Sequence, residues 1–164
     1  MSQTPAFYVG SARWTRSLTA VVDVLRQQLA RPRRNLPMLL ARSYGTPHDL
    51  GPQWRALLAT AQDGRCFWCG QPMTSHTATL EHVLPYQGPW WPRLSRLEQL
   101  LSLRLSHAVC NRAYRTWREG QHAARLTHMD QMLVRHIQRI IAAQPLLQLY
   151  EGGQYHPDRP ASSG

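Results

Sequence analysis

The sequence predicts an α+β fold, mostly helical, in which a small central module lies between N-terminal and C-terminal helices. Apolar residues recur at helical spacing within residues 17–29 and 122–143. The stretch TATLEHVL (77–84) has the β-branched character of a short strand. Two short pairs of metal-ligand residue types, CFWC (66–69) and HAVC (107–110), lie on either side of that strand. A chain of 164 residues suits one compact domain with extensions, or at most two small domains.

Residues 1–50 are expected to form a basic N-terminal helical extension. Residues 1–16 carry few structural signals and are expected to be a loose arm. A helix is expected to begin at Ser17, a suitable N-cap residue. Its apolar face would comprise Leu18, Val21, Val22, Leu25 and Leu29. The basic stretch RPRRNLP (31–37) then interrupts the pattern, and a short helix is expected over 37–43.

Residues 51–120 are expected to form the central module. Pro52 suits the first turn of a helix that runs to about Gln62, and Asp63-Gly64 predicts a turn. After the strand, the sequence predicts a loop rich in proline and aromatic residues and then two helices. These segments span residues 85–93, 94–101 and 108–120.

Residues 121–150 are expected to form a C-terminal helical segment, with the main helix over 122–143. Its apolar face would comprise Leu126, Met129, Leu133, Ile137, Ile140 and Ile141. Pro145 is expected to end the regular pattern, and residues 151–164 are expected to be a disordered tail. The apolar faces of the outer helices suit either packing onto the central module or pairing with a second copy or a partner protein.

The charge balance points to a polyanionic partner. The chain has nineteen basic residues, all of them arginine, against nine acidic ones, for a net charge of +10. A G+C-rich genome would explain arginine in place of lysine, but not the excess over acidic residues. Nucleic acid is therefore the expected partner, with double-stranded DNA as the working assumption, although the sequence does not separate DNA from RNA. We expect no signal peptide and no membrane span.

The three cysteines and one histidine predict a structural zinc site. Cys66 and Cys69 form one pair, and His107 and Cys110 form the other. Four nitrogen and sulfur ligands from two short pairs are typical of a closed tetrahedral site. The alternative is that Cys110 is a buried free thiol and His107 an incidental surface residue. An odd number of cysteines argues against a disulfide framework and for a reducing compartment, which we take to be the cytoplasm of a bacterium or of a phage-infected cell.

The stretch LEHVLP (80–85) places a carboxylate and an imidazole side by side near the end of the predicted strand. Asn111 follows Cys110 directly, so on a helix it would face about 100° away from zinc, toward Glu81 and His82. Glu81 and Asn111 supply oxygen ligands that suit Mg²⁺ or Mn²⁺. His82 has a side chain able to deprotonate a water molecule. Alone, EHVLP would more often be a surface glutamate and a partly buried histidine.

The motifs CFWCG, LEHVLP and LRLSHAVCNRAYR together resemble the HNH (ββα-metal) endonucleases of the zinc-knuckle type. The resemblance covers roughly residues 55–118. It implies a ββα-metal fold, phosphodiester hydrolysis, a general base at His82 and metal ligands at Glu81 and Asn111. Three positions depart from the family pattern. Glu81 replaces the commoner aspartate, His107 replaces a knuckle cysteine, and Ser102 stands where the family has an asparagine that braces the loop bearing the catalytic histidine.

Four arginines are expected to contact nucleic-acid phosphates: Arg104, Arg112, Arg115 and Arg118. The alternative for the last three is a solvated helix face. Trp90 and Trp91 suit base stacking or, more commonly, coverage of a small core. The leading hypothesis is a metal-dependent DNA endonuclease. The alternatives are a zinc-stabilised nucleic-acid-binding module with a decayed catalytic site, and an RNA-directed or nicking subunit of a larger assembly.

Overall fold

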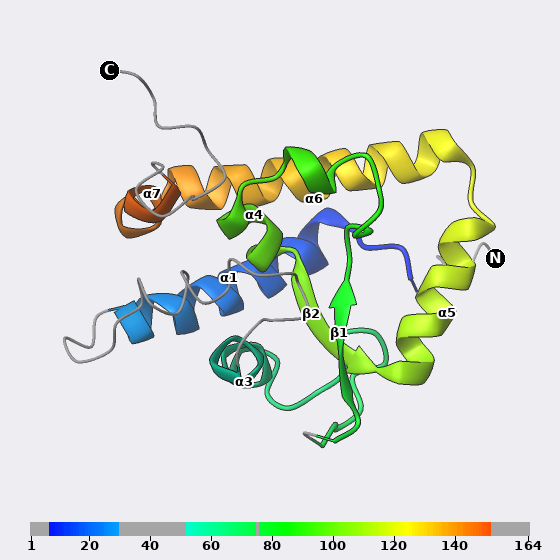
Figure 1. Ribbon diagram of the computed structural model, residues 1–164, viewed down its shortest axis with the longest axis horizontal. Coiled ribbons are helices and arrows are strands. Elements are labelled where there is room, and N and C mark those ends of the chain that lie inside the picture. The colour runs from blue at the N-terminus through cyan, green and yellow to red at the C-terminus, as the bar shows by residue number, and fades with distance from the viewer. Residues whose placement is uncertain (1–6, 30–51, 75, 152–164) are drawn as a thin grey trace.

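The computed structural model describes residues 7–29, 52–74 and 76–151, and these form a mostly helical α+β fold around a two-stranded sheet (Figure 1). The expected fold class is thereby confirmed. The elements follow one another as α1 (Ser11–Leu29), α3 (Pro52–Ala61), β1 (Ala78–His82), η2 (Trp91–Arg93), α4 (Arg96–Leu101), β2 (Leu103–His107), α5 (Ala108–Glu119), α6 (Ala123–Ala142) and α7 (Pro145–Glu151).

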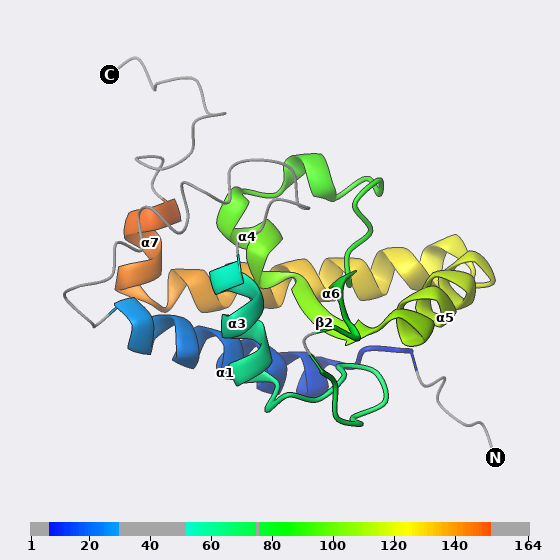
Figure 2. The same cartoon turned by 60° about the horizontal axis from the view of Figure 1, so that its bottom comes forward.

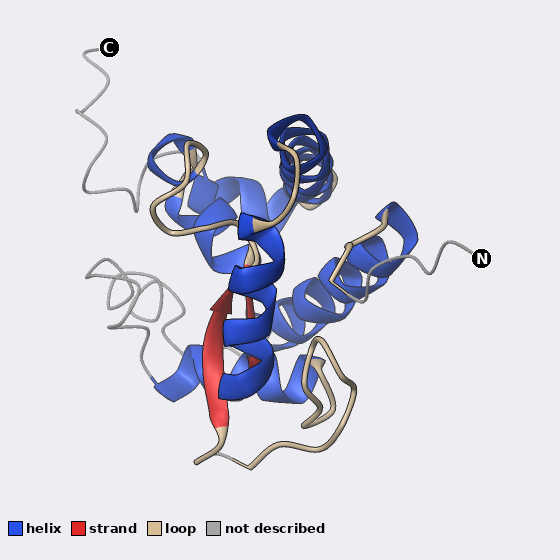
Figure 3. Cartoon of the chain, turned by 90° about the vertical axis from the view of Figure 1, so that its right-hand side faces the viewer, coloured by secondary structure: helices blue, strands red, loops and turns tan. Residues whose placement is uncertain are grey.

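The sheet is an antiparallel pair in which Ala78 lies opposite His107 and His82 lies opposite Leu103. Helix α5 follows β2 directly and packs against both strands, whereas η2 and α4 lie between β1 and β2 in the chain. Figure 3 views the β1–β2 hairpin from the side of α5. Strand β2 was not expected from the sequence. Its first four residues alternate leucine with Arg104 and Ser106, yet both of these polar side chains are fully buried.

Helix α1 begins at Ser11, so the expectation of a loose arm over residues 1–16 is wrong for residues 11–16. The reason is tertiary: Trp14 is fully buried, and its indole Nε1 donates a hydrogen bond to the carbonyl of Leu133 in α6 at 3.1 Å. Ser17 therefore lies inside the helix and does not cap it. The predicted apolar face is otherwise confirmed, because Leu18, Val21, Val22 and Leu25 are buried.

Helices α1 and α6 pack against each other and lie side by side in both views of the ribbon (Figures 1 and 2). Their apolar faces join those of α3, α4, α7 and the hairpin in one hydrophobic core. Within the described chain, the N-terminal and C-terminal helices thus share a core with the strands. That core fixes the hairpin from behind and leaves α5 on the opposite side.

The structure also differs from expectation at Pro145 and at the start of α4, which begins at Arg96. Pro145 starts α7 and does not end the regular structure, because proline is well suited to the first turn of a helix. Helix α4 is capped by Ser95, whose hydroxyl accepts from the Glu98 amide while the Glu98 carboxylate accepts from the Ser95 amide. The predicted helix over 37–43 and the residues of the tail from 152 onward lie outside the described residues. None of the described helices is long and apolar enough to cross a membrane.

Candidate metal centre and adjoining pocket

The structure brings together the four residues of the predicted zinc set. The ligand atoms of Cys66, Cys69, His107 and Cys110 all lie within 4.8 Å of one another. A tetrahedron with metal–sulfur bonds of about 2.3 Å has edges of roughly 3.8 Å, so the cluster has dimensions that suit zinc. The Cys₃His group could therefore bind a structural metal ion.

Local backbone geometry positions the first pair. Residues 66–69 form a tight turn in which the amide of Gly70 donates to the carbonyl of Cys66 at 2.9 Å. Gly70 has a φ of 71°, in the left-handed region that glycine adopts without steric strain. The turn is joined to β2 because the amide of Phe67 donates to the carbonyl of Leu105 at 3.0 Å. The second pair then follows at the end of β2 and in the first turn of α5.

His107 has the hydrogen bond expected of a metal ligand. Its Nε2 lies 3.0 Å from the carbonyl oxygen of Pro72, which can only accept, so the ring proton must be on Nε2. In the neutral imidazole the lone pair is then on Nδ1, which lies 3.3 Å from Sγ of Cys69. Metal-bound histidines commonly use their other nitrogen in this way. The geometry favours a ligand over an incidental surface histidine.

The thiols are electrostatically unequal. Burial raises the pKa of Cys66, but hydrogen bonds from the backbone amides of Cys69, His107 and Trp68 outweigh it and lower the pKa to about 7. Burial and the neighbouring thiolates of Cys66 and Cys69 raise the pKa of Cys110 to about 12. A divalent cation at the centre of the cluster would offset this repulsion between sulfurs.

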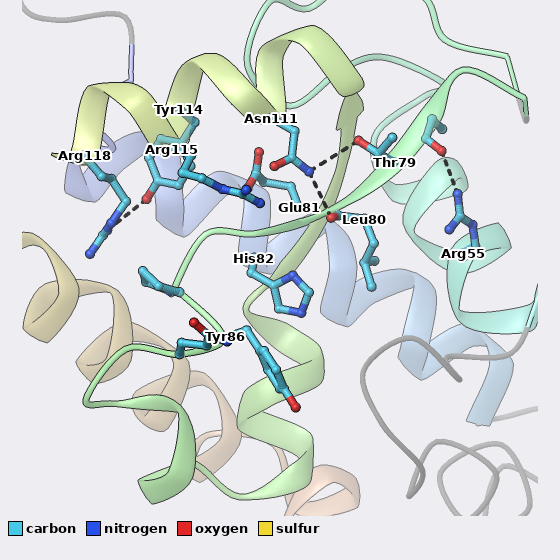
Figure 4. A pocket seen from close by; sticks show the side chains of 13 residues that line it. Arg55, Thr79, Leu80, Glu81, His82, Tyr86, Asn111, Tyr114, Arg115 and Arg118 are labelled. Carbon is cyan, nitrogen blue, oxygen red and sulfur yellow. Dashed lines mark hydrogen bonds between the residues drawn. The ribbon is translucent and has the colours of Figure 1, made fainter.

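A pocket of about 730 Å³ lies beside this cluster, between β1, the start of the following loop, α5 and α3. Glu81, His82 and Asn111 all line it. Figure 4 shows Glu81 and Asn111 next to each other above the end of β1, with His82 on the other side of the strand. Glu81 and His82 are adjacent on a strand, so their side chains point to opposite faces, and each lines the same pocket from a different side.

Glu81 is only 3% exposed, and its carboxylate accepts hydrogen bonds from two donors. Its Oε2 accepts from the indole Nε1 of Trp68 at 2.8 Å and from the Ser106 hydroxyl at 3.4 Å. Burial raises the pKa of Glu81 to about 7, although these two donors and the charge of Arg115 act in the opposite direction. Oε1 has no hydrogen-bond partner among the described residues and is left for a ligand.

The side-chain amide of Asn111 is oriented by β1. Its Nδ2 donates to the carbonyl of Leu80 at 3.1 Å and lies 3.4 Å from the hydroxyl of Thr79. Because a backbone carbonyl cannot donate, the nitrogen must be on that side, and Oδ1 is available to coordinate a cation. Asn111 and Glu81 can therefore each offer one side-chain oxygen to a cation, as the sequence predicts.

The segment that follows His82 is braced by Tyr114. Its hydroxyl donates to the carbonyl of Val83 at 2.7 Å and accepts from Arg118 at 3.0 Å. Ser102, which occupies the position of the family's bracing asparagine, donates its hydroxyl to Gln99 in α4. A tyrosine on α5 thus supports this loop, and sequence spacing alone carried no signal for it.

The arginines predicted to contact phosphate have different environments. Arg112 and Arg115 are exposed on α5, and Arg115 lines the pocket. Arg118 also lines the pocket, but its guanidinium forms a two-pronged ion pair with Asp130 of α6 at 2.7 and 2.9 Å. Arg55 of α3, which is not among the four arginines expected to contact phosphate, lines the same pocket while donating to the carbonyl of Ala78.

The prediction that Arg104 contacts nucleic acid is wrong, because this side chain is fully buried. Its Nη1 donates to the carbonyls of Leu101 and Leu103, its Nε donates to Ser17, and its guanidinium stacks on Trp14 at 4.5 Å. Burial lowers its pKa. The guanidinium therefore secures the end of α4 to α1 and cannot reach a phosphate.

The tryptophans of the loop follow the commoner of their two expected roles. Trp91 is buried in the shared core, and its ring also meets the imidazole of His82 edge to face at 5.1 Å. Tyr86 lies 5.8 Å from the same imidazole and is 43% exposed at the mouth of the pocket. Trp91 therefore holds the ring of His82 from the protein side.

Comparisons with protein-family models, curated proteins and solved structures find no match to this chain.

Proposed function

We propose that the protein is a zinc-stabilised HNH-type endonuclease that hydrolyses DNA phosphodiester bonds with the help of Mg²⁺ or Mn²⁺. The observation that carries the proposal is that Glu81, His82 and Asn111 line one pocket beside the Cys₃His cluster. The net charge of +10 supports a nucleic-acid substrate, with double-stranded DNA as the first choice. Three reduced thiols in one metal cluster fit a cytoplasmic protein.

The residues of the pocket fit a hard divalent cation. Oε1 of Glu81 and Oδ1 of Asn111 would hold it, and a site with only two protein oxygens leaves room for water and substrate phosphate. When bound, such an ion supplies charge stabilisation to the scissile phosphate and the leaving oxygen.

His82 would act as the general base by accepting a proton from the attacking water. Its edge-to-face contact with Trp91 restricts the ring, so that the imidazole is held in place beside the substrate. Arg115 and Arg55 line the pocket from α5 and α3 and would contact phosphates on either side of the scissile bond. These contacts add affinity without reading sequence.

The second candidate is a zinc-stabilised binding module without catalysis. One observation favours it: the Ser102 hydroxyl is used within α4 and does not support the loop that bears His82. Against it, Tyr114 provides a brace to Val83, and the three proposed catalytic side chains all face one pocket. An RNA-directed or nicking role within an assembly uses the same site and differs only in substrate.

Zinc-loaded protein is expected to cleave plasmid only after Mg²⁺ or Mn²⁺ is added. Substituting Glu81→Gln keeps an oxygen that accepts from Trp68 but removes the charge, and should lower the rate at least about a hundredfold, or roughly 2.7 kcal/mol. Agarose gels with plasmid, single-stranded DNA and RNA would identify the substrate. Salt-sensitive binding without cleavage in every ion tested would support the binding module instead.

Affinity for Mn²⁺ is expected to rise with pH until about pH 7 and then level off. The ion binds the ionised form of Glu81, and burial raises the pKa of this carboxyl to about 7. Below that pH a proton must be released on binding, so affinity should fall by up to about tenfold per pH unit. Isothermal titration between pH 5.5 and 8 with Mn²⁺ would measure it. A flat profile would exclude Glu81 as a ligand with this pKa.

A further inference from the structure

The tryptophan inside the first metal-ligand pair contacts a side chain that lines the pocket. Trp68 lies between Cys66 and Cys69, and its indole Nε1 donates to Oε2 of Glu81 at 2.8 Å. Among the described residues, no other hydrogen bond joins the 66–69 turn directly to Glu81 or Asn111. The turn that holds two of the zinc ligands therefore also supplies a hydrogen bond to the buried carboxylate.

Ring packing fixes the direction of this donor. The indole of Trp68 packs against Phe67 at 4.7 Å and against Tyr114 at 4.3 Å between ring centroids. Phe7 closes the group with an edge-to-face contact at 5.4 Å. With the ring held on three sides, the N–H has one direction, and it points at Glu81.

The contact distinguishes the two oxygens of the Glu81 carboxylate. Oε2 is held by Trp68 and, more weakly, by Ser106 of β2, whereas Oε1 has no partner among the described residues. If the indole donor is lost, the Ser106 hydroxyl at 3.4 Å is the one hydrogen-bond donor that the described residues still offer to the carboxylate, whose orientation is then less firmly fixed. A freely rotating ligand binds a cation more weakly because its orientation must be fixed on binding.

We propose that Trp68 is a positioning residue that orients Glu81 for the divalent ion, so that the zinc knuckle itself sets the affinity of the pocket for that ion. The inference rests on the proposed function, since it assumes that Glu81 is a ligand. It adds a second role to the knuckle, which stabilises the fold and also holds one side chain of the reaction site.

Trp68→Phe removes the N–H donor and retains an aromatic ring. Trp117→Phe is the matched control, because Trp117 stacks on Tyr114 in the same cluster while its Nε1 has no hydrogen-bond partner among the described residues. With zinc at saturation, Mn²⁺ affinity measured by electron paramagnetic resonance should fall about tenfold in Trp68→Phe. In Trp117→Phe it should change less than about twofold.

A readout that needs no second ion is the indole signal of Trp68 in ¹H–¹⁵N spectra. The signal is assigned by its loss in Trp68→Phe. It should move upfield in Glu81→Ala, where the acceptor is gone, while the signal of Trp14 stays in place. Trp14 donates to Leu133 in the core and so reports that the fold is intact.

The outcomes separate the two proposals. The positioning role would be overturned if Trp68→Phe bound Mn²⁺ with wild-type affinity, or if the indole signal of Trp68 did not shift in Glu81→Ala. Neither result would contradict the nuclease proposal. Failure of the wild-type protein to bind Mn²⁺ at all would count against the proposed ion site itself. A tenfold loss confined to Trp68→Phe, with the indole shift, would support the inference.

Discussion

Replacing His82 with alanine is expected to reduce cleavage of plasmid by about 10²–10⁴-fold, the usual contribution of a general base. The imidazole lines the pocket together with Glu81 and Asn111. The other two side chains are the proposed ion ligands, so the histidine is the group of the three that is left to accept a proton from water. Single-turnover assays at saturating Mg²⁺ would measure the loss at the chemical step.

DNA affinity and folding should be preserved in that variant. His82 is half-buried and contacts the rings of Trp91 and Tyr86, so its removal deletes ring contacts at the pocket wall without opening the core. His76→Ala provides the matched control, because His76 is exposed in the turn before β1 and should leave the rate unchanged. Cleavage at the wild-type rate by the His82 variant would remove this residue from the mechanism.

The parts of the fold that could be predicted are those set by local chemistry. The ligands of the metal cluster come as two pairs spaced three residues apart, and such pairs can converge on one ion in few ways. Asp63 and Gly64 form the expected turn, and both have positive φ. Pro52 likewise begins α3 as expected.

The errors come from tertiary contacts that leave no local pattern. Ser17 has the residue type of an N-cap, but burial of Trp14 against α6 extends α1 by six residues, back to Ser11. Arg104 looks like a surface cation in sequence. Only the folded chain brings Trp14, Ser17 and two carbonyls around its guanidinium.

The candidate site shows the same division. Glu81, His82 and Asn111 were identified from motifs, because their roles require particular side chains at particular positions. The residues that orient them could not be identified in this way, because in the sequence Trp68 and Tyr114 resemble ordinary aromatic core residues. Only the structure shows that Trp68 donates to Glu81 and that Tyr114 donates to the carbonyl of Val83. The position of Trp68 inside the C-x-x-C pair was the one feature of the sequence that could have pointed to its role.

Of the substitutions considered, replacing Cys110 with serine is expected to lower the free energy of unfolding most. Serine is a poor zinc ligand, and a structural zinc ion contributes on the order of 10 kcal/mol to the folding of small metal-dependent modules. The loss should be greatest where backbone structure depends on the cluster, namely the 66–72 turn and its link from Phe67 to Leu105. Amide hydrogen exchange there should accelerate at least about a hundredfold, with zinc content measured in parallel.

Helices α1 and α6 should keep most of their protection in the same experiment, because they pack on each other through a core that does not include the cluster ligands. Val109→Ser is the control: Val109 is the preceding residue on α5 and is 63% exposed, so this change should affect neither zinc content nor exchange. Unaltered protection of the turn in zinc-free Cys110→Ser protein would show that aromatic packing of Phe67 and Trp68 holds the turn without a metal ion. The cluster would then have to be explained by something other than folding stability.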